Sequence, residues 1–179
     1  PLSTWDTSEV TSMDFLFKRK WIRSFSGVSK WDVSSVYTME NMFGLDYINI
    51  PPPDLSEWKT PALQNMNYMF AYSPHADIPG LGNLDTSNVK SIDCIFLHSG
   101  FSGDLSRWET HNLRSMEGAF YRAIQFTGES IVDWDVSNVV DYSQAFKEAS
   151  IFNADLSKWK ICTVGAGTDS YEGLTIIHN

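Results

Sequence analysis

The chain has 179 residues, 42% of them hydrophobic, and its 22 acidic and 13 basic side chains give a formal net charge of −9. This length suits one domain or one array of repeats, and no apolar run approaches the ~20 residues of a membrane-spanning helix. The excess of acids argues against a nucleic-acid partner, because binding to a phosphate backbone depends on Lys and Arg.

A short motif near the start of the chain returns throughout it. Trp5-Asp6-Thr7-Ser8-Glu9-Val10 has close or looser copies that begin at six later positions, and successive anchors are 26, 27, 26, 24, 26 and 25 residues apart. A period of about 25 residues is typical of stacked repeats, which bury their apolar faces against one another. We predict one repeat domain over residues 1–164 and a degenerate cap or tail over residues 165–179. The seven anchors are Trp5, Trp31, Trp58, Leu84, Trp108, Trp134 and Trp159.

Each repeat predicts a short strand, a short helix and a return turn. Trp5 and the second residue after it have the alternating spacing of a strand. Val10, Met13 and Phe17 follow at spacings of three and four, which indicate one face of a helix. Ser8 stands just before this run, where its hydroxyl is expected to cap the helix. Equivalent positions are occupied by Ser34, Ser87 and Ser137.

Stacking places equivalent residues in columns, so we expect the Trp, Met and Phe columns to form the core. Aligned repeats read Leu-x-x-Trp-x-Val-x-x-Val-x-x-Met-x-x-Met-Phe, and the best matches lie at residues 54–58, 28–36 and 155–159. This pattern resembles the BspA-like leucine-rich repeat in its Trp/Met-Phe variant.

The resemblance implies an α/β repeat fold. We expect a leucine-rich-repeat-like right-handed solenoid of seven turns of about 25 residues, with a short-stranded parallel sheet on one side and short helices on the other. The resemblance also implies a secreted or cell-surface protein that acts in adhesion or interaction and has no known catalysis.

No motif for catalysis or cofactor binding is present. The four His side chains occupy different repeats and form no pair with metal-ligand spacing. Two isolated Cys, Cys94 and Cys162, fit neither a disulfide scaffold nor a zinc site. Nucleophile elbows, phosphate loops and dinucleotide fingerprints are also absent from the sequence. We therefore expect no enzyme, no cofactor and no metal site.

The residues directly before and after each anchor are expected to point outward and to form a charged face. Asp133 and Asp135 lack a basic neighbour in the sequence pattern and form the most acidic point predicted on that face. An Asp in this position can also have a structural role, by hydrogen-bonding the backbone of a turn. A calcium site would need about six to eight converging oxygens, which one Asp in each repeat seldom supplies. Partner binding and a structural role both stay open. The predicted partner-binding residues are Asp6, Asp32, Asp85, Glu109, Asp133, Asp135, Lys30 and Arg107.

The leading functional hypothesis is a non-catalytic protein-interaction or adhesion module that uses this charged sheet face. Its partner would be a protein, with a basic surface as one possibility. One alternative is a structural accessory subunit of a larger assembly. Another is an extracellular carbohydrate-binding module that uses aromatic residues outside the core columns: Trp21, Tyr37, Tyr47 and Tyr121.

Overall fold

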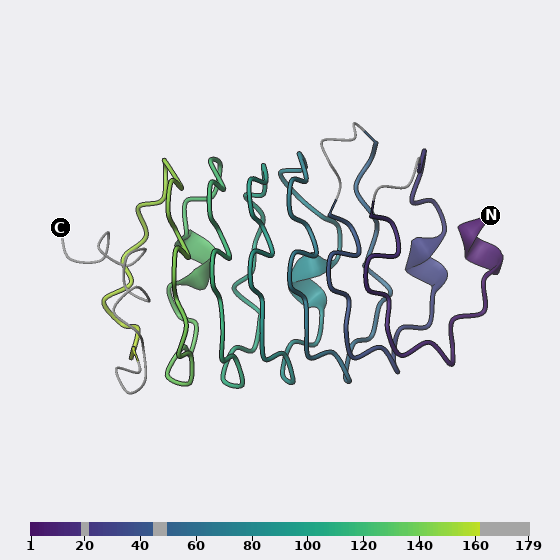
Figure 1. Cartoon of the computed structure of the whole chain (residues 1–179), viewed down its shortest axis with the longest axis horizontal. Coiled ribbons are helices and arrows are strands. Elements are labelled where there is room, and N and C mark those ends of the chain that lie inside the picture. The colour runs from purple at the N-terminus through teal and green to yellow at the C-terminus, as the bar shows by residue number, and fades with distance from the viewer. Residues whose placement is uncertain (19–21, 45–49, 162–179) are drawn as a thin grey trace.

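The computed structural model describes residues 1–18, 22–44 and 50–161. Figure 1 shows this part of the chain as a row of stacked turns, with the N-terminal turn at the right. Isolated parallel bridges connect successive turns seven residues after each of the first six anchors, so the period of the sequence is also the period of the stack. The bridged residues are Ser12, Thr38, Asn65, Ser91, Ser115 and Asp141.

Regular secondary structure in the described ranges is limited to four 3₁₀ helices of three residues each. A left-handed glycine precedes each of the last three, and a side chain at Gly80 would clash because its Cβ would lie 2.3 Å from the Ser56 nitrogen. The helices, also visible in Figure 1, are η1 (Leu2–Thr4), η2 (Val28–Lys30), η3 (Leu81–Asn83) and η4 (Glu129–Ile131).

The predicted fold class is therefore wrong. Within the described residues, the parallel bridges stay isolated instead of extending into the strands of a sheet, and no α-helix forms. The molecule is not a leucine-rich-repeat-like solenoid with a parallel sheet and helices. The described ranges also contain no helix long and apolar enough to cross a membrane. The predicted cap or tail at residues 165–179 lies outside the described residues.

The expected strands do not form at the anchors, because the backbone there is extended but its N–H groups donate within their own turn, as Trp31 does to the Val28 carbonyl at 3.1 Å. Trp31 has φ −72° and ψ 136°, and Leu84 has φ −61° and ψ 141°, which are close to polyproline II values. Side chains satisfy the neighbouring backbone here: the indole N–H of Trp58 donates to the Val28 carbonyl at 2.8 Å. Backbone bridges form seven residues later instead.

The expected helices do not form. Linked turns occupy these residues instead, and they place apolar side chains at the same spacings of three and four. In the third repeat, the N–H of Met69 donates to the Met66 carbonyl at 3.2 Å and closes a turn around Tyr68. Tyr68 has a left-handed φ of 57°, as a type II turn requires at its third residue and an α-helix excludes. The N–H of Tyr68 donates at 2.8 Å to the carbonyl of Asp93 in the next turn.

Left-handed backbone recurs at two positions in the turns. The first position lies ten residues after the anchor, and the second lies fourteen residues after it. Non-glycine side chains occupy most of these positions, although glycine adopts this conformation at lower cost. The first set is Phe15, Asn41, Tyr68, Cys94, Gly118 and Gln144, and the second is Tyr72, His98, Arg122 and Glu148.

The core runs along the axis of the stack. Phenylalanine rings from successive turns pack with centroids 5.5 to 6.1 Å apart, from Phe17 to Phe146. The Met column is buried, as are the anchors from Trp31 to Trp159, which confirms the core prediction for these residues. Trp5 is the exception, since it is 52% exposed and stacks on Trp31 at 5.6 Å.

Candidate interaction surface

The eight predicted partner-binding residues are all exposed. Asp6 accepts the N–H and the hydroxyl of Ser8 at 3.1 and 2.7 Å, and Asp135 accepts those of Ser137 at the same two distances. Asp32 and Asp85 bind the Ser two residues later in the same way. Each of these carboxylates is therefore held within its own turn. The predicted helix-capping role of the Ser hydroxyls is wrong, because they donate to these carboxylates.

These local hydrogen bonds stabilise the charged form of the Asp side chains. The hydroxyl and the N–H of the following Ser hold the pKa of Asp6, Asp32 and Asp135 below the ordinary value for Asp. An Asp that already accepts two hydrogen bonds from its own turn has a structural role, whether or not it also meets a partner.

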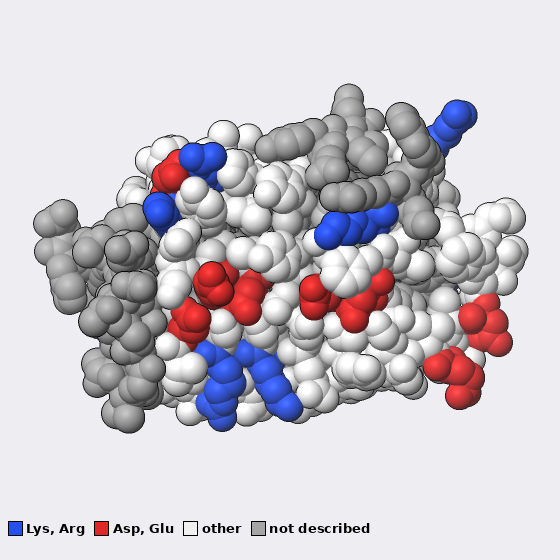
Figure 2. All heavy atoms as spheres, viewed as in Figure 1, with Lys and Arg blue, Asp and Glu red and all other residues white. Residues whose placement is uncertain are grey.

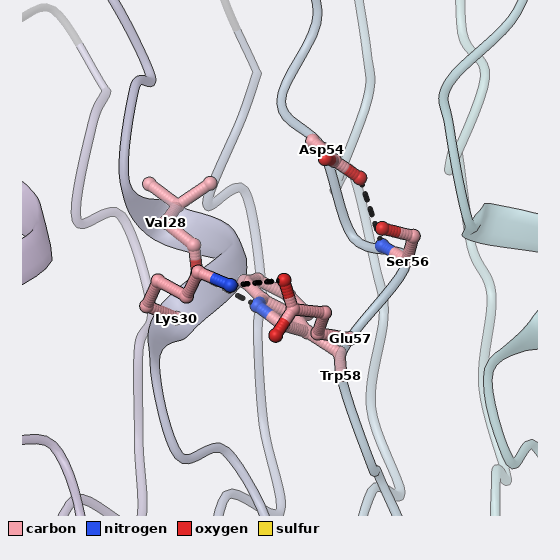
Figure 3. A network of polar contacts seen from close by, with 6 residues as sticks. All are labelled: Val28, Lys30, Asp54, Ser56, Glu57 and Trp58. Carbon is pink, nitrogen blue, oxygen red and sulfur yellow. Dashed lines mark hydrogen bonds and ion pairs between the residues drawn. The ribbon is translucent and has the colours of Figure 1, made fainter.

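The residues directly before the anchors pair across neighbouring turns. Figure 3 shows Lys30, whose Nζ lies 2.5 Å from a Glu57 carboxylate oxygen. Arg107 donates to the Asn83 side-chain oxygen at 2.7 Å. The Lys158 Nζ lies 2.6 Å from Asp133. Asp133 therefore has a basic neighbour, contrary to the sequence-based expectation. Glu109 is exposed, and its backbone N–H donates to Thr86.

Sequence reasoning did not single out a set of Asn side chains that connect the turns. The Asn112 side chain donates to the Ser87 carbonyl at 2.7 Å, and Asn138 donates to the His111 carbonyl at 2.8 Å. Asn88 donates to the Pro61 carbonyl at 2.9 Å. The signal was present in the sequence, because Asn stands four residues after the anchor in three successive repeats.

Acidic side chains also follow the bridged residues, and they hydrogen-bond the next turn. The Asp93 Oδ1 accepts the Ser115 hydroxyl at 2.5 Å and the Glu117 N–H at 2.9 Å. Burial, with the carboxylates of Asp141 and Asp93 nearby, raises the pKa of Glu117. Figure 2 shows acidic atoms along the middle of one face, with basic atoms to either side. In the part of the chain that the structure describes, no three His, Cys, Asp or Glu side chains could hold a metal ion.

A ridge of aromatic and charged side chains follows the second left-handed position. We define the ridge as Tyr72, His98, Tyr121, Arg122, Lys147 and Glu148. The Tyr72 ring stacks on the His98 ring with centroids 5.5 Å apart, and Tyr121 meets His98 edge-on at 5.8 Å. These rings come from three successive turns, so only stacking of the turns brings them together.

Charged groups complete the ridge. The Arg122 Nε lies 2.5 Å from a Glu148 oxygen, and the Arg122 guanidinium lies 5.4 Å from the Tyr121 ring centre. Tyr121 donates its hydroxyl to Glu148 at 3.1 Å, and the Lys147 Nζ lies 6.0 Å from the same ring centre. The Arg122 hydrogen bond holds the pKa of Glu148 below its ordinary value. The Arg122 and Glu148 side chains are 43% and 44% exposed, so the ridge is accessible to a partner.

A hollow of about 310 Å³ lies beside the ridge, with His98 and Arg122 at its edge. Pro74, Gly100 and Ile124 also line it. Its volume is near the lower limit of about 300 Å³ for small-molecule pockets. The hollow therefore suits one side chain better than a whole ligand.

Of the aromatic residues considered for carbohydrate binding, Tyr121 belongs to the ridge and Tyr37 is 48% exposed elsewhere. Trp21 and Tyr47 lie outside the described residues. Sequence reasoning singled out Tyr121 but missed the rest of the ridge. Four of its members stand fourteen residues after their anchors, but they are four different residue types, so the repeat pattern does not mark them as a group.

The fold and the surface define a protein of stacked irregular turns that offers rows of exposed charged side chains and half-buried aromatic rings. The chain belongs to the family described as Mycoplasma protein of unknown function, DUF285, which matches residues 1–98 and 75–177. No curated protein and no solved structure matches the chain. The family description names no activity. The secreted or cell-surface location expected from the sequence stays a prediction.

Proposed function

We propose that this chain is a non-catalytic protein-interaction module whose main contact surface is the ridge. The observation that supports this function is the packing of Tyr72, His98, Tyr121 and Arg122 from three successive turns into one accessible cluster. Tyr and Arg are enriched among the residues that dominate binding energy at protein interfaces. Rings that already pack on one another lose little conformational freedom when a partner covers them.

The charged face with the Asp residues is less suited to be the main contact. Most of its charges are held by their own turns or paired with a neighbouring turn, as for Lys30 and Glu57. Exposed ion pairs of this kind contribute only about 0 to 1 kcal/mol. We therefore assign these residues to the periphery of an interface. With Arg122 and Lys147 in the ridge, the proposal favours a partner with an acidic surface instead of the basic surface first considered.

The test compares partner binding by three versions of the protein. The ridge variant carries Tyr121→Ala and Arg122→Ala, and the matched control carries Lys30→Ala and Glu57→Ala, which remove another exposed cross-turn pair. A partner purified with the native protein is identified, and its affinity for each version is measured by calorimetry. We expect the ridge variant to lose more than about tenfold in affinity and the control to change less than about twofold.

Thermal denaturation of each version first establishes that the variants remain folded. A purified partner that binds the ridge variant as tightly as the native protein would overturn the ridge as the contact surface. A charge-reversed version, Asp133→Lys with Asp135→Lys, then identifies the alternative. Lost binding in that version alone would place the contact on the charged face.

A further inference from the structure

We infer that the hollow beside the ridge takes an aliphatic side chain from an acidic segment of the partner, with a carboxylate of that segment next to Arg122. This inference rests on the proposed interaction function and specifies the peptide chemistry that the site would recognise. The simplest matching sequence is a Leu followed by a Glu.

The hollow lies where Gly100 stands between two apolar residues of the neighbouring turns. Pro74, Gly100 and Ile124 stand sixteen residues after their anchors in three successive turns. Gly100 leaves bare backbone between its two apolar neighbours, and its N–H donates to the Ser73 carbonyl at 2.9 Å. A Cβ at Gly100 would lie 2.7 Å from the Pro74 oxygen. The turn with Gly100 therefore approaches the Pro74 backbone closely, and the hollow lies among the surrounding residues, with Pro74 and Ile124 in its lining.

The walls of the hollow favour an apolar occupant. Ile124 is 56% exposed, more than any other large hydrophobic residue in the described ranges. Pro74 and His98 are also part of the lining. An aliphatic side chain between Pro74 and Ile124 would remove apolar surface from water on both sides, which is the main favourable term in association.

The charge at the rim favours an acidic neighbour. Arg122 and Lys147 lie at the ridge with one carboxylate, Glu148, so the local charge is positive although the chain carries −9. Arg122 already binds Glu148 through Nε and lies 3.3 Å from the His98 Nε2 through one terminal nitrogen, so a carboxylate of the partner would be attracted by the charges of Arg122 and Lys147 together. A basic residue in the same place would be repelled by Arg122.

Two other hollows of similar size lack the combination of an apolar wall and a basic rim. Each has a volume of about 340 Å³. One is lined by Asp54, and the other by Asp104 and Glu129, and neither lining includes Lys, Arg or His. Both lack the apolar wall with a basic rim that Ile124 and Arg122 create.

The test is a titration of ¹⁵N-labelled protein with three blocked dipeptides, observed by NMR. The probes are acetyl-Leu-Glu-amide, acetyl-Ser-Glu-amide and acetyl-Leu-Lys-amide. We expect acetyl-Leu-Glu-amide to shift the amide signals of Ser99, Gly100 and Gln125 in a saturable way, with a dissociation constant on the order of millimolar. The other two probes should bind at least about fivefold more weakly, because each lacks one of the two recognised groups.

Three variants then locate the binding. Ile124→Ser should weaken acetyl-Leu-Glu-amide at least about fivefold, and Arg122→Gln should abolish the preference for Glu over Lys. Ile151→Ser makes the same change at another exposed Ile, which is 49% exposed, and should leave binding unchanged. The inference is overturned if no saturable shift occurs, if the three probes bind equally, or if Ile151→Ser weakens binding as much as Ile124→Ser.

Failure here can be separated from failure of the proposed function. If the dipeptides do not bind but the Tyr121→Ala and Arg122→Ala variant still loses the partner, only the assignment of the hollow is wrong. If that variant also keeps full affinity for the partner, the ridge proposal is wrong as well.

Discussion

At the scale of single residues, buried Trp side chains join successive turns. The indole N–H of Trp108 donates to the Leu81 carbonyl at 3.0 Å, and equivalent bonds of 2.7 to 3.1 Å recur along the stack. The Leu81 carbonyl also accepts the backbone N–H of Leu84 at 3.3 Å, so the indole bond adds the net value of one hydrogen bond, about 0.5 to 1.5 kcal/mol. The anchor column therefore fixes neighbouring turns through a directional bond as well as by apolar burial.

We expect Trp108→Phe to lower the free energy of unfolding by about 1 to 3 kcal/mol, because it removes the indole bond to the Leu81 carbonyl and leaves a space in the core. Urea denaturation measures the change. Trp5→Phe is the matched control, since Trp5 is 52% exposed, and it should cost less than about 1 kcal/mol. Equal losses in the two variants would show that the indole bond contributes nothing.

Asp135 and Glu117 make opposite contributions to the pH dependence of the free energy of unfolding. For Asp135, whose folded-state pKa is lowered by Ser137, the stabilisation is present above the unfolded-state pKa and is lost as the pH falls. For Glu117, whose pKa is raised by burial and by Asp141 and Asp93, the charged form is disfavoured in the folded state. The charged Glu117 side chain therefore lowers the free energy of unfolding at neutral pH, and this loss disappears as the pH falls below the unfolded-state pKa.

Glu117→Gln is therefore expected to raise the free energy of unfolding at pH 7 by up to about 0.5 kcal/mol, a small change because the side chain is only partly buried and stays largely exposed to water. The gain should shrink towards zero below about pH 4, where the native Glu is protonated. Denaturant titrations at several pH values measure it. Glu9→Gln removes the same charge at another exposed site, and a gain of equal size there would contradict the assigned cause.

At the scale of the element, each repeat is built from linked turns with left-handed residues. The apolar spacing of three and four was correctly identified in the sequence but wrongly assigned to a helix. The turn from Met66 to Met69 produces the same spacing, and the left-handed Tyr68 inside it rules out an α-helix. Sequence alone did not reveal this, because Tyr and Gln are not residues that favour left-handed backbone.

We expect Gln144→Val to destabilise the protein by about 1 to 3 kcal/mol, because Gln144 has φ 58° and a β-branched residue is strained there. Gln144→Gly should stay within about 1 kcal/mol of the native protein. Thermal denaturation measures both. Gln125→Val is the control, since Gln125 is exposed and has no left-handed φ. A similar loss in Gln125→Val would show that the backbone conformation is not the cause.

At the scale of the whole molecule, bonds between turns replace regular secondary structure. Isolated parallel bridges, indole bonds and Asn side chains each connect one turn to the next. The only helices in the described ranges are four short 3₁₀ segments. A cooperative fold is still expected, because each turn buries its apolar face only when its neighbours are in place.

Circular dichroism should accordingly show no paired minima of α-helix in the far ultraviolet. The near-ultraviolet signal should be strong, because aromatic rings such as Trp108 and Trp134 are stacked in fixed positions 5.8 Å apart. Both signals are expected to disappear in one transition on heating. An α-helical spectrum would contradict the fold described above and favour the strand-and-helix alternative.

The sequence by itself determined the period of the stack, the buried columns and the outward placement of charged residues such as Asp135. Every repeat buries the same positions, so apolar residues recur at those positions along the chain and can be recognised from this one sequence. Only the tertiary structure decided which backbone groups bond across turns and which side chains form the ridge. Tyr72, His98 and Tyr121 share no motif, and they meet because left-handed backbone and stacking bring residues about 25 positions apart into contact.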